Sequence, residues 1–299
     1  MERVTLLGRI LDRLQRRTPI APERARPAPV TAGGRILITG AGGGVASLIR
    51  PILAQRYARV RLTDRNLVAC VASNEEFVRA DLEDAVAIDA AVNGVNGIVH
   101  LGGVAKEDAI EALIPANIIG MSNILEAARK HGVRRFVFAS TMHIMGFYSR
   151  NERFHEASPP RPDSRYAATK VFGEALAQVH ANKHGIAIAC IRIGHATADP
   201  ADAEPGNWIG PADLARLIQV GLEHPDIGFE IFHAVAPSLG ERIGSRRAGA
   251  FGYRHRQSDS RNVAASADTW FGRNGVARWF RGGFFAAAEH DDGAPEARS

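Results

Sequence analysis

The sequence predicts an α/β fold, a Rossmann-type doubly wound parallel sheet with a small C-terminal substrate lobe. From Arg35 onward, short apolar runs of strand length alternate with segments of helical periodicity. This β-α-β rhythm is typical of a parallel sheet that is covered on both faces. A glycine-rich turn, Gly40 to Gly44, stands between the first apolar run and the first helical segment. Dinucleotide-binding folds have their phosphate-binding turn at this point.

The boundaries of the expected elements follow from the same periodicity. Beyond Pro211 the pattern weakens into shorter segments with Gly and Arg, which indicates the smaller lobe. We divide the chain into a basic segment at 1–34, a domain at 35–290 and a disordered tail at 291–299, with the cofactor part at about 35–195 and the substrate lobe mostly at 196–290. The expected strands are 35–39, 60–63, 98–101, 136–139 and 187–193, and the expected helices are 45–58, 85–92, one that ends near 130, and 164–183.

The composition is ordinary for a soluble globular protein, with 45% hydrophobic and 23% charged residues among 299. No stretch approaches the ~20 apolar residues that are needed to span a bilayer. Cys70 and Cys190 both sit in apolar runs and are expected to be buried free thiols, which suits the cytoplasm. No Cys/His cluster has metal-ligand spacing, so no metal site is expected.

Part of the net charge of +5 lies in the first 26 residues. Residues 1–17 predict a short basic amphipathic helix, and the prolines after it predict an extended linker. This helix either contacts a membrane or a partner, or packs loosely on its own domain. The chain has no nucleic-acid-binding motif, so no nucleic-acid partner is expected.

The glycine-rich turn has the spacing and the setting that a dinucleotide requires. Gly40 permits a tight turn, Gly43 lets the backbone approach a pyrophosphate, and the helix that follows offers free N–H groups and a positive dipole end. Asp64 ends the second strand at about the distance where an acid meets the adenosine ribose, which favours NAD over NADP. Arg65 follows directly and keeps NADP as the alternative.

Tyr166 and Lys170 stand four residues apart on a predicted helix and therefore share one face. A free phenol titrates near ~10 and is a poor base at neutral pH. A neighbouring ammonium favours the phenolate, so we expect Lys170 to lower the pKa of Tyr166. The pair is a candidate proton-transfer device, although the same spacing also occurs on solvated helices.

Taken together, the motifs resemble the extended short-chain dehydrogenase/reductase family, of the NAD-dependent epimerase/dehydratase type. The resemblance covers roughly residues 35–287, and within the family the chain is most similar to the NAD-dependent uronate dehydrogenases. The motifs that carry it are Thr39-Gly40-x-x-Gly43, Asp81-Leu82, His100-Leu101-Gly102-Gly103, Asn117-x-x-Gly120-x-x-Asn123, Phe138-Ala139-Ser140-Thr141, Tyr166-x-x-x-Lys170 and Arg192-Ile193-Gly194.

The resemblance implies a role for each matching position. Tyr166 would accept the proton of the substrate hydroxyl, Lys170 would hold the nicotinamide ribose, and Thr141 would hydrogen-bond the substrate oxygen. The implied cofactor-binding residues are Gly40, Gly43, Gly44, Val45, Asp64, Asp81, Leu82, Leu101, Gly102, Gly103, Asn117, Tyr166 and Lys170. The implied substrate-facing residues are Ala105, Thr141, Met142, His143 and His195.

Several positions depart from the family pattern. Thr141 replaces a serine and can donate the same hydrogen bond, whereas Met142 stands where the family has an asparagine beside the substrate-facing histidine. The arginine expected shortly before Trp208 to clamp a uronate carboxylate is missing. The proton machinery is therefore kept while the substrate pocket is changed, and His195 or an arginine of the late basic stretch is the candidate replacement.

We expect NAD-dependent oxidation of a sugar hydroxyl. The substrate that we expect first is a hexuronate, which would be oxidised to its aldarolactone. The alternatives are a sugar-phosphate dehydrogenase, a nucleotide-sugar epimerase or dehydratase, and a non-catalytic NAD-binding module. A dehydratase usually adds an acid pair near the hydroxyl motif, and Met142-His143 offers none. Non-catalytic chains tend to lose the tyrosine or the lysine, and both are present. The expected partners are a small sugar and other copies of the chain in a homo-oligomer.

Overall fold

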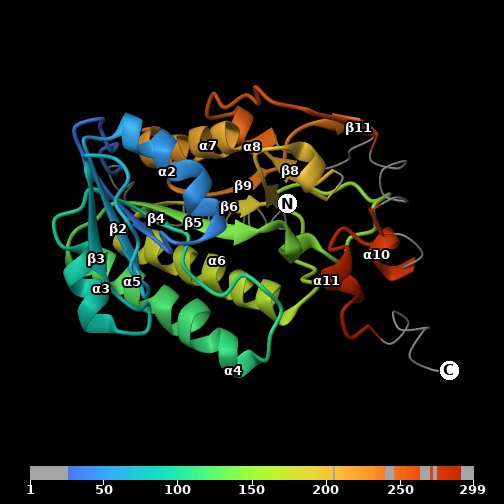
Figure 1. The fold of residues 1–299 in the computed structure, drawn as a ribbon, viewed down its shortest axis with the longest axis horizontal. Coiled ribbons are helices and arrows are strands. Elements are labelled where there is room, and N and C mark those ends of the chain that lie inside the picture. Colours follow the sequence, from blue (N-terminus) through green and yellow to red (C-terminus); the bar gives the residue numbers. More distant parts are fainter. Residues whose placement is uncertain (1–25, 205, 240–245, 263–269, 272–274, 291–299) are drawn as a thin grey trace, which may run out of the picture.

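A seven-stranded parallel sheet forms the centre of the protein (Figure 1). The computed structural model describes residues 26–204, 206–239, 246–262, 270–271 and 275–290. The predicted N-terminal amphipathic helix and the predicted tail at 291–299 lie outside these residues. Among the residues described, no helix combines the length and the apolar character that crossing a membrane requires.

The strand order places a crevice at the middle of the sheet. The order β3-β2-β1-β4-β5-β6-β9 reverses direction between β1 and β4, so the connections on either side of this point leave in opposite directions. In such sheets, ligands bind outside the carboxyl ends of the strands at that reversal. The strands are β1 (Arg35–Thr39), β2 (Arg59–Asp64), β3 (Glu75–Arg79), β4 (Gly97–His100), β5 (Arg135–Thr141), β6 (Ala187–Ile193) and β9 (Phe229–Ala234).

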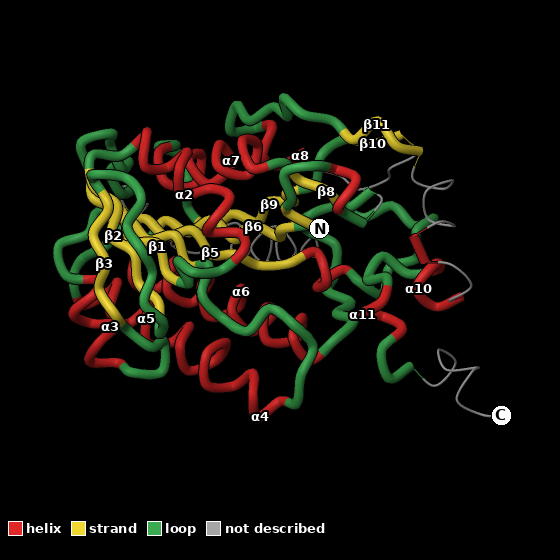
Figure 2. The backbone as a smooth tube through the Cα atoms, viewed as in Figure 1, coloured by secondary structure: helices red, strands yellow, loops and turns green. Residues whose placement is uncertain are grey.

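Helices cover both faces of the sheet, as the doubly wound prediction requires (Figure 2). One face carries α2 (Gly44–Arg56) and α7 (Pro211–Glu223), which pack through Leu53 and Leu217 in one buried apolar cluster. The other face carries α3 (Ala85–Val92), α5 (Gly120–Lys130) and α6 (Arg165–His184). Its separate cluster includes Ile88, Ile124 and Ala177. The strands β5 and β6 are buried along their whole length because they lie between these two clusters.

The helix expected to end near residue 130 is interrupted. It begins as α4 (Ile110–Leu113), widens into a π-helical segment η1 (Ile114–Ile119) and continues as α5. Pro115 stands at the start of the wide segment, where its missing N–H cannot complete an α-helical ladder. The side chain of Asn117 projects from this segment, and π-helical turns are frequent at functional sites.

Residues 211–234, which the sequence analysis assigned to the substrate lobe, add α7 and β9 to the main sheet. β3 was not expected, because this partly exposed edge strand reads Glu-Glu-Phe-Val-Arg rather than as an apolar run. The remaining segments form short pieces beside the sheet. They are β7 (His195–Ala196) with β8 (Trp208–Ile209), β10 (Ser238–Leu239) with β11 (Asp259–Asn262), the turns η2 (Met142–Met145) and η3 (Pro200–Asp202), and the helices α8 (Arg246–Gly249), α10 (Gly275–Trp279) and α11 (Phe284–Ala287).

One of the two cysteines departs from expectation. Cys190 is buried in β6, but Cys70 is exposed. The apolar residues around Cys70 are themselves exposed, since Leu67 and Val71 lie on the loop between β2 and β3 rather than in the core. The prediction of a buried thiol at Cys70 is therefore wrong.

A buried ion pair joins α6 to β6 beneath the carboxyl edge of the sheet. The Arg192 guanidinium makes two hydrogen bonds to the Glu174 carboxylate, Nε–Oε1 at 2.9 Å and Nη2–Oε2 at 2.7 Å. The Ser140 hydroxyl donates to the same carboxylate at 2.7 Å. All three side chains are buried, so the Arg192 and Glu174 charges are stabilised by each other rather than by water.

Glu174→Ala is expected to lower the free energy of unfolding by about 3–5 kcal/mol, because it leaves the Arg192 charge buried without a carboxylate. Replacing both residues by leucine is expected to recover much of this loss. The control is Glu76→Ala, which removes the partly exposed partner of Arg61 and is expected to cost less than about 1 kcal/mol. Urea unfolding of the three variants measures these differences. Equal losses for the Glu174 and Glu76 variants would contradict the account.

Candidate functional site

A cleft of about 710 Å³ runs along the carboxyl ends of the strands at the reversal of the sheet. Its walls are the turn after β1, the end of β2 and the loops that follow β3 and β4. The cofactor residues expected from the sequence that line it are Gly40, Gly43, Gly44, Val45, Asp64, Asp81, Leu82, Leu101, Gly102 and Gly103, together with the substrate position Ala105. These residues come from four separate segments of the chain, and the fold brings them to one surface.

The turn after β1 needs glycine at Gly40. Its φ of +64° lies in the left-handed region, and an added Cβ would stand 2.6 Å from the Gly102 Cα. The loop after β4 can approach this closely because the Gly102 N–H donates to the Thr39 hydroxyl at 3.1 Å. Gly44 is the first residue of α2. A Cβ added there would meet nothing within 4 Å, so the start of the helix is open to the cleft. Backbone N–H groups at such a helix start bind phosphate, so this part of the cleft suits the pyrophosphate of a dinucleotide.

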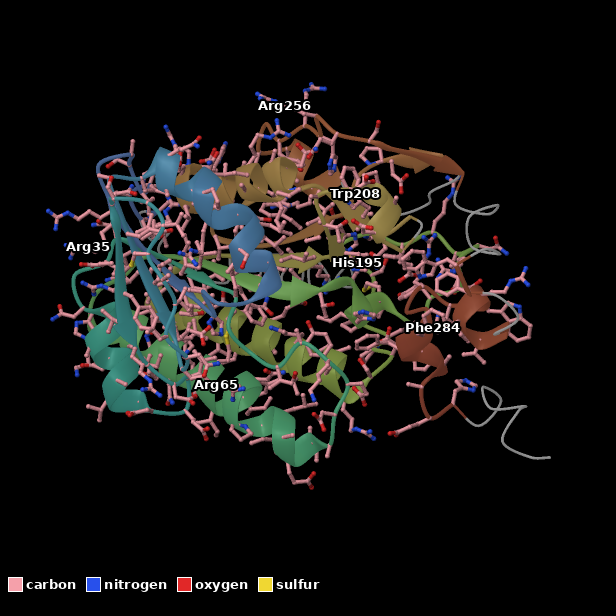
Figure 3. All side chains as sticks on the ribbon, viewed as in Figure 1. Arg35, Arg65, His195, Trp208, Arg256 and Phe284 are labelled. Atoms are coloured by element: carbon pink, nitrogen blue, oxygen red, sulfur yellow. The ribbon has the colours of Figure 1, made fainter. Side chains whose placement is uncertain are left out.

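Two backbone N–H groups hold the Asp64 carboxylate at the end of β2, where the adenosine is expected. Its carboxylate accepts hydrogen bonds from the N–H of Gly42 at 3.1 Å and of Asn66 at 3.0 Å. These bonds orient the carboxylate toward the turn that the phosphates would approach. Arg65, the residue that keeps NADP as an alternative, also lines the cleft (Figure 3).

The first two turns of α6 carry Tyr166 and Lys170, the two residues that the sequence singled out. Ser164 caps the helix by accepting from the Ala167 N–H at 3.1 Å. A second acceptor comes from the loop after β4, where the Glu107 carboxylate accepts from the N–H groups of Arg165 at 3.2 Å and Tyr166 at 3.0 Å. A carboxylate at this position also stabilises the positive end of the helix dipole. The start of the helix is therefore tied to the loop that lines the cleft.

Tyr166 and Lys170 are both buried and lie beside the end of β5. The Lys170 ammonium donates to the Ala139 carbonyl at 3.0 Å and lies 4.9 Å from the centre of the Phe138 ring and 5.9 Å from that of Tyr166. Burial lowers the pKa of Lys170 to about 8. Burial also raises the pKa of Tyr166 to about 12, against a hydrogen bond with Thr141 that favours the phenolate.

The expectation that Lys170 lowers the pKa of Tyr166 is therefore not met in the chain alone. Removal of the phenol from water penalises the phenolate more than its neighbours favour it. Lys170 is itself buried, and its ammonium is directed to the Ala139 carbonyl rather than to the phenol. A phenolate at this position needs a further positive charge, and the bound cofactor is the group that would bring one.

His143 stands beside Tyr166 and is oriented by a buried acid. Its Nδ1 lies 2.8 Å from Oδ2 of Asp163, whose side chain is completely buried. The carboxylate accepts, so Nδ1 carries the proton, and in the neutral ring Nε2 is the acceptor. The Phe285 ring of α11 stacks on the imidazole with ring centres 4.1 Å apart, and it lies 6.2 Å from the Tyr166 ring. The imidazole and the Phe285 ring, with the Thr141 hydroxyl, therefore lie next to the phenol.

Asn117 and Gly103 connect the cleft to this reactive group. The Asn117 amide accepts from the Val104 N–H at 2.8 Å and donates to the Val104 carbonyl at 3.0 Å and to the Thr169 hydroxyl at 2.9 Å. A Cβ on Gly103 would lie 2.7 Å from the Asn117 oxygen and 3.7 Å from the Lys170 nitrogen. The loop that lines the cleft therefore passes directly over Lys170.

Two predicted substrate positions lie in other surroundings. Met142 is buried in a small apolar cluster with Ile144 and Met145. His195 is exposed on β7, and its Nδ1 accepts from the Glu204 N–H at 3.2 Å in the short sheet that it forms with Trp208 (Figure 3). A role for either residue in binding substrate remains a prediction.

Sequence reasoning missed three residues of the site: Glu107, Asp163 and Phe285. Asp163 directly precedes the helix cap Ser164. Its carboxylate lies between Gly146 and Gly282, and this position is visible only in the folded chain. An added Cβ on Gly146 or Gly282 would stand within 2 Å of its carboxylate. Phe285 comes from the end of the chain, where the resemblance is thin. Glu107 and Phe285 reach the site only through tertiary contacts, so no local sequence pattern predicts that they belong to it.

The arginines near the site already have carboxylate partners. Arg150 pairs with Glu204 at 2.7 Å, and Arg165 pairs with both Glu107 and Glu289. No arginine stands just before Trp208 in the sequence, and Arg150 reaches this segment through its ion pair with Glu204. The side of the site that would receive the rest of the sugar is aromatic through Phe285.

Comparison with known proteins agrees with this geometry. Residues 36–210 match the NAD dependent epimerase/dehydratase family. A uronate dehydrogenase from Pseudomonas putida is 36% identical over 86% of this chain and 97% of that protein. An NAD-dependent glucose-6-phosphate dehydrogenase from Haloferax volcanii is 30% identical over 67% of this chain and 84% of that protein.

A similar solved structure is a variant of the uronate dehydrogenase from Agrobacterium tumefaciens in complex with NAD. It superimposes with a TM-score of 0.77 at 34% identity and covers 85% of this chain and 97% of that chain. The similarity therefore extends beyond the cofactor half of the fold to the segments that surround the reactive group.

Lys170→Met is expected to raise the free energy of unfolding at pH 7 by about 1–3 kcal/mol, because it removes the cost of a buried charge at the loss of one hydrogen bond. The pKa of this lysine is depressed in the folded state, so the cost is fully present below pH ~8 and disappears as the pH rises toward ~10.4. Unfolding curves from pH 7 to 10.5 measure the difference. Lys130→Met, at an exposed position, is the control. A variant less stable than the parent at pH 7 would contradict the burial argument.

Proposed function

Because the chain belongs to the NAD dependent epimerase/dehydratase family, we propose that it is an NAD-dependent dehydrogenase that oxidises a sugar hydroxyl, with a hexuronate as the substrate. One observation carries this proposal: Tyr166, Lys170 and Thr141 converge at the end of β5, and the loop that lines the cofactor cleft passes over Lys170. Proton transfer and cofactor binding therefore share one edge of the sheet.

The reaction divides into the loss of a proton and of a hydride from one carbon–oxygen group. Tyr166, as phenolate, accepts the hydroxyl proton, and the Thr141 hydroxyl donates a hydrogen bond that holds the substrate oxygen beside it. Bound NAD would supply the acceptor for the hydride. When the hydroxyl is the anomeric one, the loss of both leaves a carbonyl at the ring carbon, and a hexuronate becomes its aldarolactone.

Lys170 has two tasks in this proposal. Its ammonium lies beneath Gly103, where it would bind the hydroxyls of the nicotinamide ribose, and its charge, 5.9 Å from the centre of the Tyr166 ring, would add to that of the bound cofactor in favouring the phenolate. His143 would accept a hydrogen bond from the sugar through Nε2, because Nδ1 is committed to Asp163. Phe285 would then contact an apolar face of the sugar ring.

Similarity to uronate dehydrogenases supports a hexuronate as the substrate, whereas the absence of one arginine opposes it. The Pseudomonas putida and Agrobacterium tumefaciens proteins are named uronate dehydrogenases. The arginine that would recognise the carboxylate is missing before Trp208, and Arg150 is already paired with Glu204. A uronate would therefore need another cation, from His195 or from the late basic stretch.

A sugar phosphate is the second candidate substrate. The missing carboxylate clamp, the surplus of late arginines and the similarity to a glucose-6-phosphate dehydrogenase favour it. A nucleotide-sugar epimerase or dehydratase is a weaker candidate, because no carboxylate stands beside Thr141 at Met142 or His143. A purely NAD-binding module would have no use for a buried Tyr166 and Lys170.

The proposal is tested by NADH formation with galacturonate, glucuronate and glucose 6-phosphate. We expect turnover of a uronate. Turnover of glucose 6-phosphate alone would contradict this and would identify a sugar phosphate as the substrate. Tyr166→Phe is expected to lower kcat by at least about a hundredfold while NAD binding stays unchanged, because a general base contributes about 10²–10⁴. Tyr148→Phe removes another buried phenol, which donates to the Pro159 carbonyl, and serves as the control. Full activity of the Tyr166 variant would refute its role.

Asp64→Asn tests the choice of NAD. The amide keeps an acceptor for the Gly42 N–H but loses the negative charge that would bind the ribose hydroxyl and repel a 2′-phosphate. The ratio of kcat/KM for NAD to that for NADP is expected to fall by about ten- to a hundredfold, the value of a hydrogen bond to a charged group. Arg65→Ala is expected to move the ratio in the opposite direction. An unchanged ratio in the Asp64 variant would contradict the assignment.

Two further parts of the proposal concern the whole protein. We propose that it acts in the cytoplasm and that it associates with copies of itself. Light scattering of the purified chain measures its mass in solution, and a monomer would exclude the second part.

A further inference from the structure

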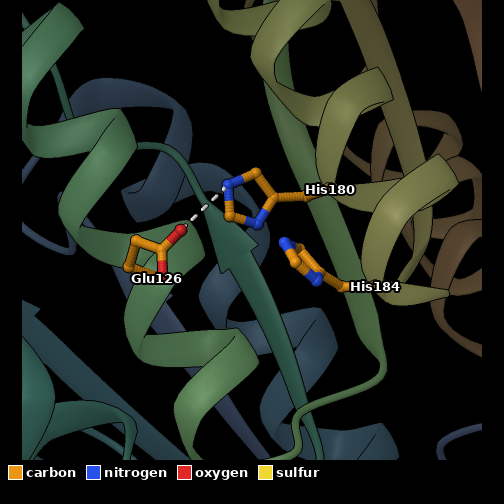
Figure 4. Close-up of side chains that lie close together, drawn as sticks. All are labelled: Glu126, His180 and His184. Atoms are coloured by element: carbon orange, nitrogen blue, oxygen red, sulfur yellow. Dashed lines mark ion pairs between the residues drawn. The ribbon is translucent and has the colours of Figure 1, made fainter.

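Two histidines and a glutamate meet at the C-terminal end of α6, at the opposite end of that helix from Tyr166. His180 and His184 lie one turn apart on α6, and Glu126 faces them from α5 (Figure 4). One potential ligand atom of each residue lies within 4.8 Å of those of the other two. The dehydrogenase chemistry proposed above uses none of these three side chains.

We propose that Glu126, His180 and His184 bind a divalent transition-metal ion of the zinc class. Imidazole nitrogens and carboxylate oxygens are ligands that Zn²⁺ shares with Ni²⁺ and Cu²⁺. Three protein ligands leave one tetrahedral position for water. Two histidines four apart on a helix present their rings to the same side, so the backbone already sets the spacing of two ligands.

The geometry needs only a small closure around the ion. Bonds of about 2.0–2.1 Å place neighbouring ligand atoms roughly 3.4 Å apart in a tetrahedron. His180 Nε2 and Glu126 Oε1 are already 3.5 Å apart, which is long for a hydrogen bond. The Glu126 side chain is half exposed and is free to adjust, whereas the buried His180 ring is held by its surroundings.

His180 is buried, and its two ring nitrogens have different surroundings. Only 4% of the residue is exposed, and its Nδ1 has no hydrogen-bond partner among the described residues. In Figure 4 the His180 ring lies between Glu126 and His184, with one nitrogen toward each. A ring gives one nitrogen to one ion, so we assign the ion to Nε2, the nitrogen that faces the Glu126 carboxylate.

The charges around the cluster have opposing effects on the binding of a cation. The C-terminal end of the helix dipole favours a cation at the last turn of α6. The Arg129 guanidinium donates to Glu126 Oε2 at 2.8 Å, which leaves Oε1 toward His180 but also opposes a second positive charge nearby. His184 and Arg129 line a cleft of about 560 Å³, which gives an ion access to the cluster.

The metal would join α5 to α6, the helix that carries Tyr166 and Lys170 in its first turns. Its expected effect is on stability, because an ion that binds only the folded chain raises the melting temperature by mass action. The sequence analysis expected no metal site. It overlooked the pair His180-x-x-x-His184, and Glu126 stands far upstream, where no spacing rule connects it to the pair.

The test uses the full-length chain after treatment with a chelator and dialysis. Isothermal titration with Zn²⁺ is expected to show one tight equivalent, and Zn²⁺ is expected to raise the melting temperature. Co²⁺ is expected to give the intense visible bands of a tetrahedral site. His184→Ala and Glu126→Gln change partly exposed ligands, so both variants are expected to fold and to bind Zn²⁺ at least about tenfold more weakly.

His131→Ala is the matched control, because His131 also pairs with a carboxylate, Asp89, at 3.0 Å but has no third ligand in the described cluster. Its Zn²⁺ affinity is expected to equal that of the parent. Unchanged affinity in the His184 and Glu126 variants, or an equal loss in the His131 variant, would overturn the proposal. Binding is read without substrate or NAD, so the result is independent of the proposed dehydrogenase activity.

Discussion

A single buried ammonium group determines how the candidate site is assembled. Lys170 lies inside the protein with its charge directed to the Ala139 carbonyl and over the Phe138 ring, both on β5. A charge removed from water must be matched by nearby dipoles, so this contact fixes α6 against the end of β5. Tyr166 lies one turn earlier on the helix and Thr141 two residues later on the strand, and the same contact therefore brings phenol and hydroxyl together.

The surrounding loops are tied to this centre by carboxylates and an amide. Glu107 joins the loop after β4 to the first turn of α6, and Asn117 joins the same loop to Thr169. Asp163 holds His143 and reaches between Gly146 and Gly282, which brings the end of the chain and Phe285 against the site. The cleft, the proposed base and the proposed substrate side are thus held together by the same contacts. The cost of this arrangement is the raised pKa of Tyr166, which makes phenolate formation depend on what binds beside it.

Local pattern was sufficient for most of the fold and for the centre of the site. Buried parallel strands such as β6 read as continuous apolar runs, and Gly40 and Tyr166 belong to motifs whose spacing is set by backbone geometry. β3 was missed because an edge strand carries charge, and the break at η1 because periodicity alone does not reveal a π-helical turn. Glu107 and Phe285 were missed because they reach the site through tertiary contacts. The raised pKa of Tyr166 could not be foreseen either, since burial depends on all the neighbours.

The most direct test of this account is the pKa of Lys170 in solution. The chain has four lysines, so side-chain NMR of protein labelled at lysine gives a spectrum in which each ammonium can be followed through a pH titration. The resonance shifted by the Phe138 ring is expected to titrate near pH 8. Titration of all four lysines together near ~10.4 would show that this ammonium remains in water, and the arrangement described here would then be wrong.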